Sequence, residues 1–346
     1  SELYSWNNNQ CGWRSNFVRS SRFIGTGMSV PDNVVPNSWF NERLGEDVDT
    51  WLQENLTIKE RRWMTEDQSV VDFCVEAGEK AIEMAGVKPE DIDLLVISTD
   101  TPEYISPSTA SVVCHKMGLK NATSFDLNTA CAGYVMASET AANFIKANPR
   151  FNHALVMGAY GMSRYLNLDD KKTVTLFADG AAAGVMKATD DDEIYHLSSD
   201  SHTKGEYFDY MGIYHGGSAH PVDEESLENG DQKLVFAKKF PKELNPLMWT
   251  QMIRTVAERG GFDVKDIKKA FMTQININQI WETMDNLGLP RETAPTIMST
   301  YGYTGSAAIG MAMDITVRNG ELNKGDIFVM MGSGGGLTFA CNAFRY

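Results

Sequence analysis

The sequence lacks the features of a membrane or secreted protein. Its 346 residues contain no run of 18 or more apolar residues, and no basic region followed by an apolar stretch opens the chain. A spanning helix and a secretory signal are therefore not expected, and we predict a cytoplasmic protein. Cysteine is also scarce, with five residues, an odd number without metal-like spacing, which favours thiols in a reducing compartment and no metal site. They are Cys11, Cys74, Cys114, Cys131 and Cys341.

Basic residues are outnumbered in this chain. The 31 Lys and Arg residues face 46 Asp and Glu residues, which gives a formal net charge of −15. Such an excess repels a phosphate backbone, so nucleic acid is not expected as a partner. An acidic carrier protein could dock only on a local basic patch, for which Lys238, Lys239 and Lys242 are the nearest candidates. The 42% hydrophobic and 22% charged content is typical of a globular protein with large cores.

Apolar runs and helical periodicities alternate along the chain in two successive series. The first series predicts strands at 21–29, 91–99, 122–128, 153–160 and 181–187, and helices at 39–56, 69–85 and 108–117. The second predicts helices at 245–259, 277–287 and 301–318, and strands at 269–274, 326–331 and 337–344. We expect an extension at 1–20 and two similar α/β halves, 21–190 and 191–346, joined at the acidic turn 190–193. The ~45 residues after that turn are typical of loops and irregular strands.

Cys131 is the strongest candidate for a chemically active residue. It follows the predicted strand 122–128 and begins a helix of small and apolar residues. Free N–H groups and the positive end of the helix dipole should favour its thiolate, an activated nucleophile. Its neighbours Ala130, Ala132 and Gly133 are small enough to let a substrate approach the sulfur. A buried structural cysteine is the alternative that these residues leave open.

Five segments resemble, in order and spacing, the ketosynthase III branch of the thiolase superfamily, the β-ketoacyl-acyl-carrier-protein synthases III. They are residues 99–110, 126–133 (DLNTACAG), 177–182, 216–218 and 332–338 (GSGGGLT). The resemblance runs from about residue 21 to 346. It implies a thiolase-like αβαβα five-layer sandwich of two related halves, usually assembled as a homodimer. It also implies that Cys131 accepts an acyl group from a thioester.

The resemblance further assigns the catalytic positions. The oxyanion hole would consist of the backbone N–H groups of Cys131 and Gly335. Where the family carries His-Gln-Ala-Asn this chain has Thr273 in place of His, and in the next glycine turn Tyr303 replaces Asn. Neither hydroxyl can act as a general base near neutral pH. Acylation of Cys131 is therefore expected to survive, whereas malonyl decarboxylative condensation is expected to be impaired.

The substrate side departs from the family as well. Trp51 matches the tryptophan that stacks on adenine, but Asn55 replaces its arginine partner, and Lys171 replaces a second arginine. Asn278 occupies the position of a basic residue that meets the carrier protein. Three further substrate-binding positions come from the matched segments, Gly217, Asn276 and Ser333. We expect no cofactor, and an acyl thioester on coenzyme A or acyl carrier protein as substrate.

Two functions follow from these patterns. The first is an acyltransferase of the ketosynthase III type in fatty-acid-like or secondary-metabolite (polyketide) biosynthesis. The second is a catalytically weak partner subunit that forms a heterodimer with an active homologue. The loop histidines His215 and His220 are alternative candidates for a base, or else structural loop residues.

Overall fold

Two stacked β-sheets organise the chain in the computed structural model, which describes residues 18–346. The first has the order β1-β7-β6-β4-β5 and comprises β1 (Ser20–Ser29), β4 (Leu94–Ser98), β5 (Thr123–Leu127), β6 (His153–Gly161) and β7 (Asp179–Thr189). The second has the order β11-β12-β13-β8 and comprises β8 (His196–Thr203), β11 (Ile267–Met272), β12 (Ile327–Gly334) and β13 (Thr338–Arg345).

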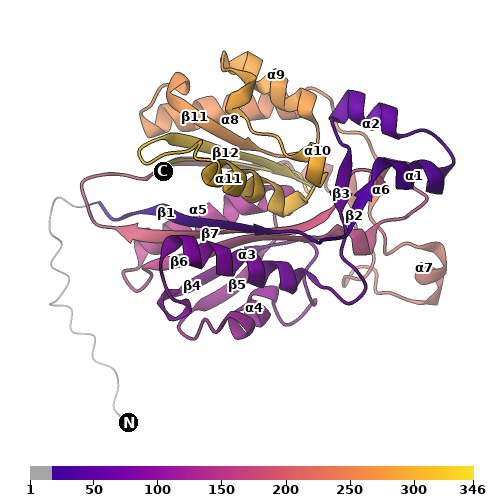
Figure 1. Cartoon of the computed structure of the whole chain (residues 1–346), viewed down its shortest axis with the longest axis horizontal. Helices are drawn as coiled ribbons and strands as arrows, with labels where there is room; N and C mark the ends of the chain where they lie inside the picture. The colour runs from indigo at the N-terminus through magenta and orange to yellow at the C-terminus, as the bar shows by residue number, and fades with distance from the viewer. Residues whose placement is uncertain (1–17) are drawn as a thin grey trace, which may run out of the picture.

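Helices cover both faces of each sheet (Figure 1). Between the sheets lie α5 (Gly133–Ala147) and α11 (Ala308–Arg318). The outer face of the first sheet is covered by α3 (Val70–Ala85) and α4 (Thr109–Met117). The outer face of the second sheet is covered by α8 (Leu244–Gly260) and α9 (Ile277–Leu287). The predicted thiolase-like five-layer αβαβα sandwich is thus confirmed. Because α5 and α11 are covered by sheets on both sides, they are rich in Ala, Gly and Met rather than amphipathic.

Several predicted elements have different bounds in the structure. The predicted helix 39–56 is two helices, α1 (Asn37–Leu44) and α2 (Asp49–Leu56), because Gly45 adopts a left-handed conformation with φ 71° and ends the first. The predicted helix 301–318 is interrupted too: α10 (Met298–Tyr301) ends at Gly302, and a 3-10 turn, η7 (Gly305–Ala307), precedes α11.

Short elements complete the fold. They are β2 (Val34–Pro36), β3 (Glu60–Arg62), α6 (Lys171–Val174), β9 (Met211–Gly212), α7 (Glu224–Asn229) and β10 (Val235–Phe236), with the 3-10 turns η1 (Pro89–Asp91), η2 (Ala130–Ala132), η3 (Met162–Tyr165), η4 (Gly205–Tyr207), η5 (Val264–Asp266) and η6 (Arg291–Thr293). The region after residue 193 also contains β8, a regular strand that the sequence pattern did not reveal.

The predicted N-terminal extension 1–20 falls largely outside the described residues, and its last residue, Ser20, already belongs to β1. All strands of the first sheet come from residues 20–189, and all strands of the second from residues 196–345. No helix within residues 18–346 combines the length and the apolar character needed to cross a membrane.

Candidate active site

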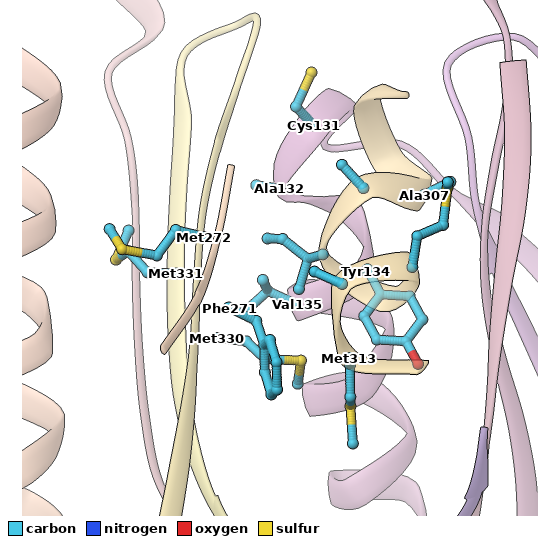
Figure 2. Close-up of a cluster of buried hydrophobic side chains, with 14 of the residues drawn as sticks. Cys131, Ala132, Tyr134, Val135, Phe271, Met272, Ala307, Met313, Met330 and Met331 are labelled. Atoms are coloured by element: carbon cyan, nitrogen blue, oxygen red, sulfur yellow. The ribbon is translucent and has the colours of Figure 1, made fainter. Parts of the chain in front are cut away.

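Cys131 lies at a strand-to-helix elbow in the middle layer of the sandwich. It occupies η2, between β5 and α5, so the predicted elbow is present. Ala130, directly before it, has φ 46°, a left-handed conformation that is uncommon outside glycine and typical of functional turns. Figure 2 shows Cys131 near the start of α5, beyond the cluster of apolar side chains that includes Ala132, Val135 and Met330. The elbow thus presents the sulfur at the boundary of the core.

Two cavities meet at Cys131. The wide cavity has a volume of about 260 Å³ and the narrow cavity about 70 Å³, and Cys131, Met211 and Gly335 line both. The wide cavity is further lined by Asp100, Asn128, Ala130, Tyr160, Met162, Phe177, Phe208, Gly212, Ile213, Tyr214, Leu234 and Gly336. The narrow cavity is further lined by Phe236, Phe240, Asn245, Thr273, Ile275, Tyr303, Ser333, Gly334 and Leu337. Within the described chain, Cys131 is the one cysteine that lines either cavity.

Tyr303 lines the narrow cavity together with Cys131. Its hydroxyl donates a hydrogen bond to Cys131, and this contact lowers the pKa of the thiol. The backbone of Tyr303 is fixed on both sides, since its N–H donates to the carbonyl of Leu176 at 2.8 Å and its carbonyl accepts from Ala178 N–H at 2.9 Å. Burial raises the pKa of the Tyr303 hydroxyl well above 10, so this group remains a hydrogen-bond donor at neutral pH.

The thiol itself is not the low-pKa group that the sequence predicted. Burial, with a smaller contribution from the carboxylate of Asp100, raises the pKa of Cys131 to about 12. The hydrogen bonds from Tyr303 and from the backbone of Cys131 oppose this shift without cancelling it. Cys131 is therefore a neutral thiol in this structure, and its activation requires a group that removes its proton.

Thr273 lies at the end of β11, on the wall of the narrow cavity. Its Oγ1 accepts a hydrogen bond from the N–H of Ser333 at 2.9 Å and faces the carbonyl of Ser333 at 3.5 Å. Ser333 in turn accepts from Trp249 Nε1 at 3.2 Å and donates to Asn245 Oδ1 at 3.1 Å. The structure thus brings Thr273, Tyr303 and Ser333 to one cavity with Cys131, but the Thr273 hydroxyl is already bonded to the backbone.

The glycine turn after β12 passes directly beside the nucleophile. A Cβ atom on Gly334 would lie 2.3 Å from the backbone nitrogen of Cys131, so only glycine allows this approach. Gly335 follows and lines both cavities. The backbone of this turn therefore lies close to the position where an oxyanion would form at Cys131.

The other predicted substrate residues lie away from the sulfur. Trp51, which is 56% exposed, and Lys171 line a separate surface depression near α2, where Lys171 forms an ion pair with Glu46 at 3.0 Å. Asn276 caps α9 by accepting the N–H of Asn278 at 3.0 Å. Within the described chain, Asn276 and Gly217 are not among the residues that line the two cavities at Cys131.

The alternative bases and the basic patch are also engaged elsewhere. The rings of His215 and His220 stack on each other with centroids 5.1 Å apart, in a loop outside the walls of both cavities. Lys238 forms an ion pair with Asp209 and lies over the ring of Tyr210. His215 and His220 therefore do not lie where they could act as a base for the Cys131 thiol.

Sequence reasoning gave no role to Asp100, although it follows a strand that is buried at every position. A charged residue immediately after such a strand was the available signal. That Asp100 and Cys131 line the same cavity could not be predicted from the sequence, because the tertiary structure brings the end of β4 and η2 together.

Comparison with known proteins agrees with this geometry. Family models for 3-oxoacyl-acyl-carrier-protein synthase III match residues 125–205, and for its C-terminal part residues 257–346. The chain is 34% identical over 329 residues to a β-ketoacyl-acyl-carrier-protein synthase III of Clostridium perfringens, covering 93% of this chain and 98% of that protein. It is 35% identical over 322 residues to an acetoacetyl-CoA synthase of Streptomyces sp. strain CL190, covering 91% and 95%.

Solved structures give the same result. The priming β-ketosynthase of the R1128 polyketide pathway matches with a TM-score of 0.84 at 27% identity, over 96% of this chain and 98% of that one. The 3-oxoacyl-acyl-carrier-protein synthase III of Aquifex aeolicus VF5 matches with a TM-score of 0.83 at 27% identity, over 94% and 100%. The elbow cysteine, the glycine turn beside it and these similarities over nearly the whole described chain lead to one assignment: the chain belongs to the 3-oxoacyl-acyl-carrier-protein synthase III (ketosynthase III) family.

Proposed function

We propose that this protein is a cytoplasmic acyltransferase that forms an acyl thioester on Cys131 in fatty-acid or polyketide biosynthesis. The observation that carries the proposal is the position of Cys131 in the wall of a cavity of about 260 Å³ that both apolar and polar side chains line. Met162, Phe177 and Leu234 among its walls suit an acyl chain, and the volume suits a short one, since pockets for larger ligands start at roughly 300 Å³.

The oxyanion of the tetrahedral intermediate would be stabilised by the N–H groups of Cys131 and Gly335. Support comes from the close approach of Gly334 to the Cys131 nitrogen and from Gly335, which lines both cavities together with Cys131. Two preorganised backbone donors at such a position are the largest single contribution in many acyl transfers.

We further propose that Thr273 and Tyr303 take the places of the family's His and Asn, and that malonyl condensation is slow as a result. The Thr273 hydroxyl donates to the carbonyl of Ser333 at 3.5 Å, and the Tyr303 hydroxyl donates to Cys131. Few donors are then left for the enolate that forms when carbon dioxide leaves. Neither hydroxyl can act as a general base near pH 7, because both pKa values are too high.

The acyl donor would be carried by acyl carrier protein or by an unusual thioester, more readily than by ordinary coenzyme A. In the depression beside Trp51, the charges of Lys171 and Lys172 are matched by Glu46 and Asp47. A site without a net positive charge binds the phosphates of coenzyme A weakly. The names of the curated relatives include both carrier types.

Intact-mass spectrometry tests the proposal. The purified protein is mixed with acetyl, hexanoyl and malonyl thioesters of coenzyme A and of a carrier protein, and the mass increase is compared between wild type and Cys131→Ala. We expect acyl uptake that the substitution abolishes. Acylation of Cys131→Ala would refute the nucleophile assignment. A wild-type chain that takes up no acyl group, and co-purifies with a homologue that has the family's Cys, His and Asn, would instead favour the partner-subunit hypothesis.

A further inference from the structure

Asp100 is held rigidly at the wide cavity by its neighbours in the sequence. The N–H of Thr99 donates to the carbonyl of Leu127 in β5 at 3.1 Å, and Thr101 Oγ1 accepts from the N–H of Gly161 in β6 at 2.8 Å. The N–H of Thr101 also donates to Thr99 Oγ1 at 3.0 Å. Asp100 is therefore held just beyond the C-terminal end of β4, between the ends of β5 and β6, in the sheet that carries the nucleophile elbow.

The carboxyl group of Asp100 is unusual for a structural residue. Its Oδ1 atom is buried and has no hydrogen-bond partner within residues 18–346. Burial raises the pKa of this carboxyl to about 6, and only the hydrogen bond from its own backbone opposes the shift. Burying an unpaired carboxylate costs folding free energy, so its presence beside a nucleophile is typical of a functional role.

Four titratable groups on separate elements interact electrostatically with Asp100. Cys131 on η2, Tyr160 on β6, Tyr165 on η3 and Tyr303 after α10 all have their pKa raised by the Asp100 charge. The three tyrosines keep their protons at neutral pH, because burial raises each pKa above 10. Asp100 is thus the group of this cluster that can change its charge near pH 7.

The close packing of this cluster depends on a glycine. A Cβ atom on Gly305 would lie 2.3 Å from the Tyr160 ring, so glycine at this position admits the ring. A second carboxyl, Asp179, also acts on Tyr160, but it is bonded to Ser163 and to the N–H of Met64 and lies outside the wide cavity. Asp100 alone among these carboxyls lines the cavity with Cys131.

We propose that Asp100 is the catalytic base and acid of the acyl transfer to Cys131. The inference rests on the proposed function and names the proton acceptor for that same site. Asp100 takes the proton of the Cys131 thiol as the sulfur attacks the thioester carbonyl. The new S–C bond forms, the bond from the carbonyl carbon to the donor sulfur breaks, and the protonated Asp100 returns its proton to the departing thiolate.

This assignment explains how a neutral thiol can react. The thiolate is the nucleophile, and burial opposes its formation, so the proton must pass to a base within the site. A base whose pKa lies near the working pH is most effective, and the Asp100 carboxyl meets that condition. Its negative charge also disappears when the thiolate charge appears, so the cavity holds one negative charge throughout.

The test compares Asp100→Asn with wild type in two reactions of the same sulfur. The first is acyl uptake from the best donor among acetyl, hexanoyl and malonyl thioesters, timed by quenched intact-mass spectrometry between pH 5 and 8. The second is alkylation by iodoacetamide. Asp192→Asn, the same change at an exposed position, is the control. We expect Asp100→Asn to slow acylation by about 10²–10⁴-fold and to abolish the rise in rate through about pH 6.

Alkylation should change in the opposite direction. Removing the Asp100 charge lowers the pKa of Cys131, so iodoacetamide should react faster with the variant than with wild type at the same pH. Opposite changes support the base role, whereas a structural role would slow both reactions together. Equal acylation rates in wild type and Asp100→Asn, or a parallel fall in both reactions, would overturn the inference. A wild-type protein that is never acylated would instead count against the proposed function.

Discussion

The Oγ1 atom of Thr273 accepts a hydrogen bond from the backbone N–H of Ser333 at 2.9 Å. This bond joins the end of β11 to the end of β12 within the wall of the narrow cavity. Both residues are buried, so the N–H of Ser333 loses its partner if the threonine oxygen is removed. The hydroxyl at position 273 therefore supports the structure as well as facing the site.

The first prediction concerns this bond. Thr273→Val keeps the shape of the side chain but removes the acceptor, which leaves a buried N–H unpaired and should lower the free energy of unfolding by about 1–3 kcal/mol. Thr273→Ser keeps the acceptor and serves as the matched control, with an expected loss below about 1.5 kcal/mol for one buried methyl group. Urea unfolding measures both. Equal stability of the Val variant and wild type would show that the bond contributes nothing.

The second prediction tests whether Thr273 and Tyr303 suppress condensation. The double change Thr273→His with Tyr303→Asn should increase the release of carbon dioxide from malonyl thioesters relative to wild type. Histidine is larger than threonine, so overpacking of ~1–3 kcal/mol could offset the gain, and thermal unfolding of the variant must be measured first. If wild-type protein condenses malonyl thioesters as fast as a homologue that has the family's His and Asn, the hypothesis that Thr273 and Tyr303 suppress condensation is wrong.

The nucleophile elbow and most elements could be predicted from the sequence because their signals are local. A strand followed by small residues places Cys131, although β5 is partly exposed rather than buried as the pattern suggested, and apolar periodicity gives the bounds of α9 at Ile277 and Leu287. The strand β8 escaped detection because it is a sheet edge whose residues, HLSSDSHT, are almost all polar. An edge strand pairs on one side only and needs no continuous apolar face.

The electrostatics of the site could not be predicted in the same way. A local argument from the helix dipole favours a thiolate at Cys131, but the pKa depends on burial by segments from both sheets and on Asp100. Likewise, the hydrogen bond from the N–H of Ser333 to Thr273 Oγ1 joins positions 60 residues apart. Such contacts are products of the tertiary structure, and no pattern within either segment specifies them.

The third prediction concerns the hydrogen bond from Tyr303 to the sulfur. Tyr303→Phe removes the donor that lowers the pKa of Cys131, so the thiolate becomes scarcer. A bond of about 1 kcal/mol corresponds to roughly fivefold slower alkylation by iodoacetamide at a fixed pH. Tyr301→Phe makes the same change outside both cavities and should leave the rate unchanged. Faster alkylation of the Tyr303 variant would show that the hydroxyl restrains the sulfur rather than stabilising its anion.

The fourth prediction concerns assembly. The loop before α4 exposes Ile105 to 89% and Tyr104 to 53%, an unfavourable arrangement for an isolated chain. From the family resemblance we expect a dimer contact near residues 108–119, which follow this loop, with an interface of more than ~2,000 Å². Ile105→Asp should shift the protein towards monomer in light scattering at micromolar concentration, whereas Val222→Asp, in the exposed segment before α7, should not. A monomeric wild type would exclude the dimer.

The last prediction concerns the pH dependence of folding. The ring of His196 stacks on Phe344 with centroids 4.8 Å apart, and burial lowers the pKa of this histidine from 6.5 to about 4. As the pH falls from about 6.5 to 4, the unfolded chain therefore binds a proton that the folded chain refuses. The free energy of unfolding should then fall by up to roughly 3 kcal/mol, the equivalent of this pKa difference. Above pH 6.5 both states hold a neutral imidazole and the penalty is absent.

The measurement is urea unfolding at pH 7.5 and pH 4.5 for wild type, His196→Gln and His115→Gln. His115 is exposed on α4 and provides the matched control. Other groups titrate over the same range, among them Asp100 and Asp179, whose raised pKa values act in the opposite direction, so the comparison is between variants rather than between pH values alone. His196→Gln should lose less stability on acidification than wild type, and His115→Gln should behave like wild type. An identical acid loss in His196→Gln and wild type would show that His196 accepts its proton without leaving the fold.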